Sequence, residues 1–484
     1  MVKSSPYLRR FAALSLLLTL AGLCGCEKTE TSSQAPASPS ASATPPAQKP
    51  VIPNSFDEVT AQLDPGGDFY LYLSTEQWLG KLSQGIDSLH DLILSGSAGQ
   101  SAQDRDEEEK GFALAKDVVQ KSGLEEITGL GVSSFNISPG LYRNKIFLHH
   151  YADKGSGILW SIYGKAPHPL AGLDLLPVDT GFAGFGDFDL AQLINFLRQE
   201  ADQSGIPEMK QAVAQWQTQF SGVSGLQLDD VLGSLNGAMG MVLTLDASDT
   251  VSIPVGSQAE TIPTPRLAIL IAVKNDLVFK RVDAMLAGTP GVSKVDEPEL
   301  RMRTMPLPII PGVDLRPSVA QWNGYLVVAS DDKIIRDIIA VQKGGPGFKS
   351  TLEYAALSAG LPQQGNSIGV CTERCADTIR KFQSQMLASQ PGASAAQAAF
   401  IDRFQNTGHA MYVGSLLPTG WLSVGQGSQG SSQLIAPMLI APAAIAASLA
   451  IPAYTGMHQR SFAPPNVPSP AVPPSPPATP GTTP

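Results

Sequence analysis

The feature that most constrains the fold of this 484-residue chain is a change in the spacing of its apolar residues, which occurs five times. In each case a strand-like run ends at a polar residue that can cap a helix, and apolar residues then recur with the period of an amphipathic helix. The five strand-like runs are 69–73, 181–185, 267–273, 325–329 and 368–370. Each of them predicts one strand followed by one helix.

The first of these units shows the pattern most fully. Ser74 follows the strand-like run, and Gln77 lies three residues later, as in a capping box. Apolar residues then recur at helical spacing: Leu79, Leu82, Ile86, Leu89 and Ile93. We therefore expect a helix over this stretch with one apolar side directed at a sheet.

Further strands are predicted between these units, at 132–137, 145–151, 158–163, 239–245, 411–416 and 421–425. Many neighbours are separated by short turns such as Pro139-Gly140, which favours antiparallel pairing. We therefore expect an α+β fold, with antiparallel β-sheets and amphipathic helices packed on one face, in loosely repeated strand–helix modules. A first module is expected at 57–225 and a second at 226–430.

Composition supports a folded body and argues against one class of partner. Hydrophobic residues make up 43% of the chain and charged residues 16%, which is the balance of a packed protein rather than a disordered one. The formal net charge is −10. A protein that binds nucleic acid needs a cationic face to displace counterions from phosphate, so we expect no nucleic-acid partner.

The N-terminus predicts export from a bacterial cytoplasm. Three basic residues precede an apolar run at 11–23, which is shorter than the stretch of about 20 residues that spans a membrane and typical of a signal peptide. Leu23-Cys24-Gly25-Cys26 follows and resembles the lipobox of bacterial lipoproteins. The resemblance implies a signal peptide at 1–25, cleavage after Gly25, a diacylglyceryl group on the Cys26 sulfur and acylation of its new amino group. The alternative is an ordinary secretory signal with incidental cysteines.

The expected location follows from this anchor. The N-terminal lipid would hold the protein on the cell membrane or the outer membrane, with its body facing the periplasm or the exterior. Residues 26–56 are rich in Ser, Thr, Ala and Pro and predict a lipidated, disordered tether. Residues 457–484 predict a Pro-rich disordered tail, for which a polyproline II ligand is the alternative.

A second hydrophobic segment is expected at 431–456, and its core, residues 434–454, contains no charge. By length alone it could cross a bilayer. Its end, Ala444–Tyr454, is similar to the apolar N-terminal helix of type IV pilins, but it lies near the C-terminus and no Glu is found near its start. Two interpretations stay open: a segment packed on the body, and a second contact with the membrane.

Residues 225–390 resemble a family of secreted or lipid-anchored bacterial proteins known only as a domain of unknown function. The similarity rests on Val231-Leu232-Gly233-Ser234-Leu235, on the strand and helix at 267–286, and on 325–339 followed by Ser350-Thr351-Leu352-Glu353-Tyr354. The resemblance implies the fold and a location in the cell envelope, and it implies no activity.

Cys371 and Cys375 are the only cysteines outside the leader, and they lie across a predicted strand-to-helix junction. A disulfide becomes geometrically feasible if Cys371 ends the strand, and an oxidising compartment would favour it. The alternative is two separate buried thiols. Their spacing differs from the C-x-x-C redox motif.

The sequence predicts no catalytic, cofactor-binding or metal-binding residues. His149 and His150 are adjacent on a predicted strand, so they point to opposite faces and cannot chelate one ion together. Neither a G-x-S-x-G nor an H-E-x-x-H motif is found.

We therefore expect a lipid-anchored, non-enzymatic envelope protein that acts as an interaction or scaffold module for an unknown envelope partner. The first alternative is a periplasmic carrier of a lipid or another apolar ligand, which predicts a large apolar cavity. The second is an enzyme with a site that the sequence does not show, which predicts a cleft with ionisable groups buried close together.

Overall fold

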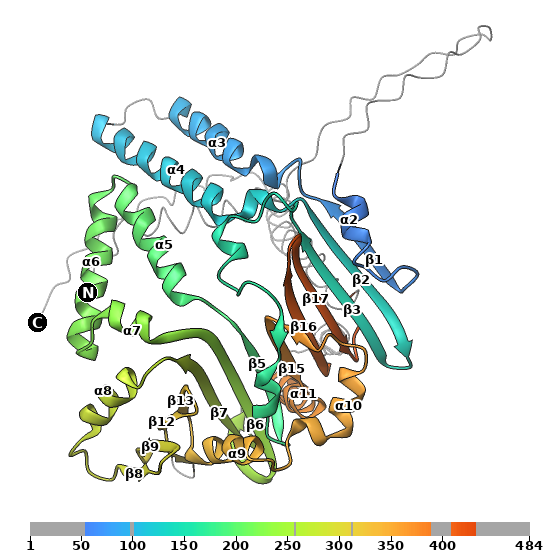
Figure 1. Ribbon diagram of the computed structural model, residues 1–484, viewed down its shortest axis with the longest axis vertical. Helices are drawn as coiled ribbons and strands as arrows, with labels where there is room; N and C mark the ends of the chain where they lie inside the picture. The colour runs from blue at the N-terminus through green and yellow to red at the C-terminus, as the bar shows by residue number, and fades with distance from the viewer. Residues whose placement is uncertain (1–53, 97–100, 256–257, 311–312, 389–407, 432–484) are drawn as a thin grey trace, which may run out of the picture. The chain divides into compact units, whose positions relative to one another are not determined.

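The computed structural model describes residues 54–96, 101–255, 258–310, 313–388 and 408–431. Their dominant feature is a 13-stranded sheet in which every neighbouring pair of strands is antiparallel (Figure 1). The expected signal peptide, nearly all of the tether, the hydrophobic segment beyond Ser431 and the tail lie outside the described residues.

The strands of this sheet are, in chain order, β1 (Phe69–Ser74), β2 (Gly129–Ser138), β3 (Leu141–His149), β5 (Thr180–Asp187), β6 (Leu235–Val255), β7 (Gln258–Val273), β8 (Ser293–Asp296), β9 (Leu300–Thr304), β12 (Ser318–Trp322), β13 (Tyr325–Ala329), β15 (Ser367–Cys371), β16 (Ala410–Leu417) and β17 (Gly420–Gly427). Their order in space is β1-β2-β3-β17-β16-β15-β5-β6-β7-β13-β12-β9-β8. Two small pairs lie apart: β4 (His168–Pro169) with β14 (Gln364–Gly365), and β10 (Leu307–Ile310) with β11 (Val313–Leu315).

The described helices are α2 (Phe56–Thr60), α3 (Leu82–Gly96), α4 (Ala102–Ser122), α5 (Leu190–Gln203), α6 (Pro207–Ser224), α7 (Leu228–Ser234), α8 (Leu277–Leu286), α9 (Asp332–Gln342), α10 (Leu352–Ser358) and α11 (Glu373–Ala388). Short 3₁₀ helices are η1 (Leu79–Lys81), η2 (Leu124–Glu126), η3 (Ile158–Trp160), η4 (Ala171–Leu175) and η5 (Phe348–Ser350). The expected α+β class is confirmed.

All five predicted strand–helix units are found, and one predicted strand is wrong. The stretch at 158–163 is not a strand but begins as η3. Trp160 is buried there, and its ring lies 4.5 Å from that of His150. A short apolar run can be buried by a single helical turn as well as by a strand, so its composition did not decide between them.

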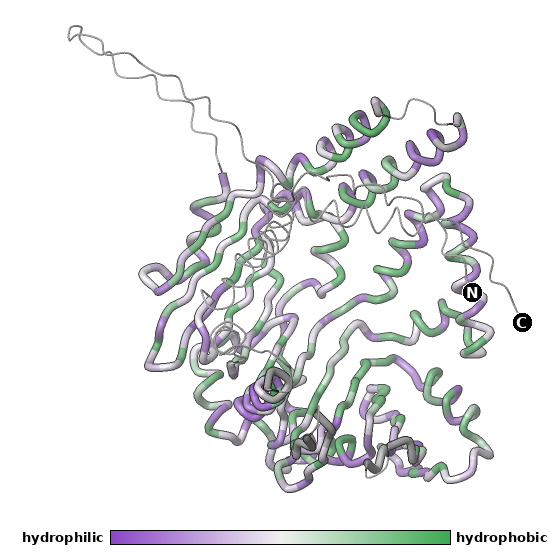
Figure 2. The backbone as a smooth tube through the Cα atoms, turned by 180° about the vertical axis from the view of Figure 1, so that it is seen from behind, coloured by the Kyte–Doolittle hydropathy of each residue, from purple (hydrophilic) through white to green (hydrophobic). Residues whose placement is uncertain are grey.

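Cross-strand register divides the side chains of the sheet between two faces. The core face carries buried residues such as Val242, Leu270 and Val327, and Ile334 and Ile338 of α9 pack against it. The alternate positions form the opposite side, which we call the open face. Apolar stretches follow the central strands as well as the helices (Figure 2).

Helices pack on both sides of the sheet, not on one alone. On the open face, Phe279 of α8 packs against Val273 and Leu326 near one end of the sheet. On the core face, α2 covers Phe147 through Val59 near the other end.

The two expected modules contribute strands to this one sheet. β5 of the first module lies between β15 and β6 of the second, and the hairpin of β16 and β17 lies between β3 and β15. The boundary expected near residue 225 falls between α6 and α7 and does not separate two sheets.

Candidate functional site

A polar cluster lies where the chain enters the described body. His149, at the end of β3, is fully buried, and its ring nitrogens lie 2.6 Å from Thr128 Oγ1 and 3.0 Å from Glu58 Oε2. Glu58 belongs to α2, which approaches β2 closely because Gly131 has no side chain. A Cβ at Gly131 would lie 2.5 Å from Val59. The cluster thus joins three segments that are far apart in the sequence.

Ser55 and Glu76 extend this cluster toward β1. The Ser55 hydroxyl donates to the Thr128 carbonyl at 2.9 Å, and the Ser55 N–H donates to Glu76 at 2.9 Å. The Tyr151 hydroxyl donates to the same carboxylate at 2.7 Å, and burial together with Glu76 raises the pKa of Tyr151. These contacts fasten the first described residues to the end of the sheet.

The hydroxyl of Thr128, the imidazole of His149 and the carboxylate of Glu58 follow one another in the order found in a hydrolase triad. A nucleophile must meet its substrate, with hydrogen-bond donors placed for the developing oxyanion. The Thr128 hydroxyl is buried and lies between the ring and the carbonyl of His149. A substrate would have to displace the contacts of Ser55 and Glu58 to reach it, so the geometry favours a structural role.

A second polar group lines a small pocket beside β5. His168 Nε2 lies 3.0 Å from both carboxylate oxygens of Asp187, and Asn366 Nδ2 donates to Asp187 at 3.0 Å. Burial lowers the pKa of His168, but the Pro169 carbonyl and Asp187 outweigh it, so the net shift is upward. The pocket has a volume of about 90 Å³, below the roughly 300–1,000 Å³ of small-molecule sites. It does not fit the carrier alternative.

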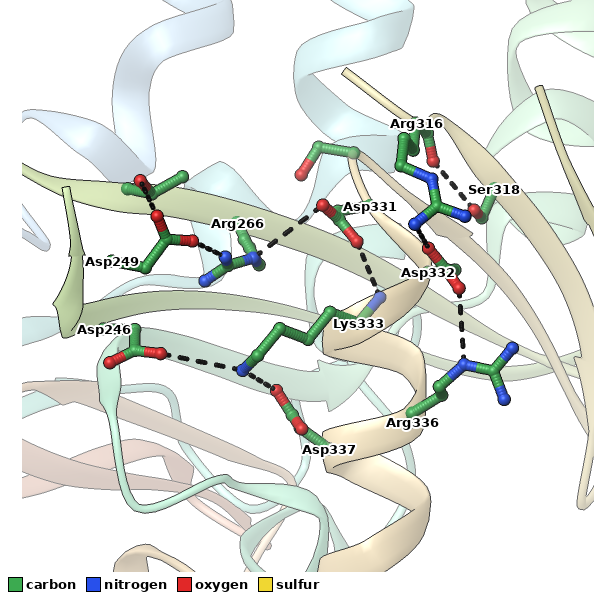
Figure 3. A network of polar contacts seen from close by, with 12 residues as sticks. Asp246, Asp249, Arg266, Arg316, Ser318, Asp331, Asp332, Lys333, Arg336 and Asp337 are labelled. Atoms are coloured by element: carbon green, nitrogen blue, oxygen red, sulfur yellow. Dashed lines mark hydrogen bonds and ion pairs between the residues drawn. The ribbon is translucent and has the colours of Figure 1, made fainter. Parts of the chain in front are cut away.

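A charged network joins α9 to the hairpin of β6 and β7 (Figure 3). Asp331 caps α9 by accepting the Lys333 N–H at 2.7 Å, and its carboxylate lies 3.9 Å from Arg266. Arg266 is buried and also pairs with Asp249, while Lys333 Nζ lies 3.7 Å from Asp246. The charges face partners of opposite sign, which is typical of a network that positions a helix.

The predicted site residues lie apart from these groups. Cys26 lies outside the described residues. Cys371 ends β15 and Cys375 lies in the first turn of α11; both thiols are free, and a hydrogen bond donated to Cys375 together with burial raises the pKa of Cys371. The structure thus brings the two cysteines together, and their disulfide stays a prediction.

Sequence reasoning missed the contacts of Glu58, Thr128 and His149. No motif links them, because Glu58 and His149 are 91 positions apart. His149 and His150 do have separate surroundings, as expected from their alternation. In the described part of the chain, no group of three or more His, Cys, Asp or Glu residues could hold a metal ion.

The two edge strands of the sheet differ in the features that usually prevent pairing with another chain. β8, at one edge, contains Lys294 and Asp296, whereas β1, at the other, has the sequence Phe-Tyr-Leu-Tyr-Leu-Ser with no charge and no proline. Large apolar side chains are exposed on β1, shortly after it in the chain, and on α2, where the ring of Phe56 lies 5.1 Å from that of Tyr72. They are Phe56 (48%), Tyr70 (41%), Leu73 (42%) and Trp78 (48%). We call these four residues the edge cluster.

Comparison of the chain with protein-family models, curated proteins and solved structures finds no match. The resemblances at 225–390 and near the C-terminus therefore stay predictions. Among the described helices, none is both long and apolar enough to cross a membrane.

Proposed function

We propose that this protein is a lipid-anchored interaction module of the bacterial envelope, which binds an extended strand of a partner protein along β1. The Leu-Cys-Gly-Cys sequence ending at Cys26 supports the anchor, and the Ser/Pro-rich stretch after it supports a tether. The body would act outside the cytoplasm, on the cell membrane or the outer membrane.

The observation that carries the proposal is the unprotected edge at β1. Edge strands of natural sheets are usually protected by charges, prolines or bulges, because their free N–H and C=O groups can pair with another chain. β8 follows this rule and β1 does not. A six-residue strand without charge or proline is an aggregation hazard when it stays exposed, so a partner that covers it would be favoured.

A partner strand added to β1 would satisfy these backbone groups and gain contacts with the edge cluster. Exposed Tyr and Trp side chains are typical of residues that dominate binding energy at interfaces. Main-chain hydrogen bonds then supply affinity, and contacts with side chains such as Tyr70 supply specificity. The contacts of Ser55 hold this edge close to the C-terminal end of the predicted tether.

Site-specific photocrosslinking in intact cells tests the strand-binding surface. A photoreactive residue at position 70 should give a discrete adduct with another protein, and Leu73→Lys in the same chain should abolish it. The matched control is Leu197→Lys, because Leu197 on α5 is similarly exposed (51%) and lies outside the edge cluster. The absence of any adduct at position 70, or equal loss with Leu197→Lys, would contradict the proposal.

Intact mass of the membrane-extracted protein tests the anchor separately. The wild type should have the mass of the chain from Cys26 plus acyl groups, and Cys26→Ser should lose this modification. An unacylated wild type would exclude the lipid anchor. It would not bear on the strand-binding surface, which the crosslinking experiment tests.

A further inference from the structure

A single row of residues crosses the open face of the sheet from β3 to β13. Register places Asn144 beside Gly425, then Tyr412, then Gly369 and Gly184 along the row. Met241, Ile269 and Val328 continue it on β6, β7 and β13. Because paired residues point to the same face, these eight positions form one row on the open face.

From Tyr412 to Val328, the side chains that the described part of the chain places in this row are apolar and exposed. Tyr412 (45%), Met241 (38%), Ile269 (40%) and Val328 (42%) are exposed although they lie on inner strands. Gly184, between Tyr412 and Met241, has open space above it: a Cβ there would meet only the Ile368 carbonyl oxygen, at 4.0 Å. A row of apolar side chains interrupted by glycine allows a segment to approach the backbone closely.

The chain itself leaves the described body at the start of this row. The Ser431 N–H donates to Ser134 Oγ at 3.1 Å, and the Ser431 hydroxyl lies 2.9 Å from Asn144 Oδ1. Ser134 pairs with Asn144 on the open face, so Ser431 lies on that face. The uncharged segment 434–454 begins three residues later.

We infer that residues 434–454 of this chain dock on the open face of the sheet, along the row from Asn144 to Val328. The seven strand spacings of this row measure about 34 Å at about 4.8 Å each. A 21-residue segment measures about 31 Å as a helix, and more where its prolines extend it. The segment therefore matches this surface in its length, in its lack of charge and in the place where the chain approaches it, at Ser431.

Crosslinking within the full-length, lipidated protein in native membranes tests this inference. A photoreactive residue at position 445, in the middle of the segment, should attach to peptides of β16, β5 or β6 of the same chain. Gly184→Leu should reduce this yield at least about fivefold, because its side chain would occupy the space that the segment needs. Gly222→Leu is the matched control, because Gly222 on α6 also has open space around it and the yield should not change.

Ile269→Lys provides a second obstruction in case Gly184→Leu disturbs the sheet, and the urea midpoint of each variant reports on folding. Crosslinks from position 445 to lipid would show insertion into the membrane, and crosslinks to a second copy would show association; either result would overturn the inference. Unchanged yields in both Gly184→Leu and Ile269→Lys would do the same. None of these outcomes bears on strand binding at β1, which the probe at position 70 tests.

Discussion

At the scale of single residues, the close approach of α2 to the sheet depends on the absence of a side chain at Gly131. Val59 and Leu63 fill the space that a Cβ would need, at 2.5 and 3.0 Å from its position. Both are buried and pack with Phe147 in a small apolar cluster. The contacts of Glu58 and Ser55 with the sheet follow from this packing, because both residues lie on α2 or directly before it.

Gly131→Ala should therefore lower the free energy of unfolding by about 1–3 kcal/mol, the range of overpacked cores. Urea denaturation followed by circular dichroism measures the change. Gly85→Ala in α3 is the control, because nothing lies within 4 Å of its added Cβ. There the better helix propensity of Ala should stabilise the protein by about 0.5–1 kcal/mol. Equal effects of the two substitutions would show that α2 is not packed this tightly.

The pair of His168 and Asp187 should make stability depend on pH. The folded-state pKa of His168 is raised, since the Pro169 carbonyl and Asp187 outweigh the opposing effect of burial. The protonated form is thus favoured by folding. Its contribution is fully present below the unfolded pKa of about 6.5 and is lost as the pH rises through the folded pKa.

His168→Gln should therefore destabilise the protein more at about pH 5.5 than at about pH 8. The difference should stay below about 1 kcal/mol, because the His168 side chain is half exposed and solvent screens the pair. Urea midpoints of wild type and variant at both pH values measure it. A larger effect at the higher pH would contradict the direction of the pKa shift.

At the scale of elements, α9 is held at its start by Asp331 and along its length by isoleucines. The Asp331 carboxylate accepts the Lys333 N–H and lies near Arg266, so it serves both as a helix cap and as an ion-pair partner (Figure 3). Ile334 and Ile338 are fully buried in the main core.

Two substitutions at this position separate the two roles. Asp331→Asn keeps the capping oxygen and removes the charge, whereas Asp331→Ala removes both. We expect Asp331→Ala to cost about 1 kcal/mol or more, and Asp331→Asn to cost less, because the contact with Arg266 is long. Thermal unfolding of the two variants compares them. An equal loss in the two variants would show that the ion pair, and not the cap, holds α9.

Prediction from sequence succeeded where the signal is local. The strand at 325–329 and the helix after it were predicted from apolar spacing and a capping residue, and both are found as β13 and α9. The stretch at 158–163 failed because too few residues define a period there. The local spacing of apolar residues does not show which strands pair with each other. Neither the pairing of β3 with β17 nor the contact of His149 with Glu58 could therefore be predicted.

At the scale of the whole described body, the parts of the chain before and after residue 225 contribute neighbouring strands to one sheet. Both neighbours of β5, namely β6 and β15, come from after residue 225, and β17 pairs with β3 from before it. The main core likewise combines Leu173 and Ala183 with Leu270 and Ile338. The repeated strand–helix pattern along the chain therefore does not correspond to two separate cores.

The fragments 54–225 and 226–431 should consequently fail to fold alone. The first would expose both sides of β5 and one side of β3, and the second would lack β5 between β15 and β6, which leaves unpaired edges prone to aggregation. We expect neither fragment to show a cooperative urea transition, whereas a chain of residues 54–431 should unfold in one. Mixing the two fragments during refolding should restore the transition if the sheet assembles from both. A cooperative transition of 54–225 alone would instead show that its strands form an independent domain, and the pairing of β5 with both neighbours would then be a contact between domains.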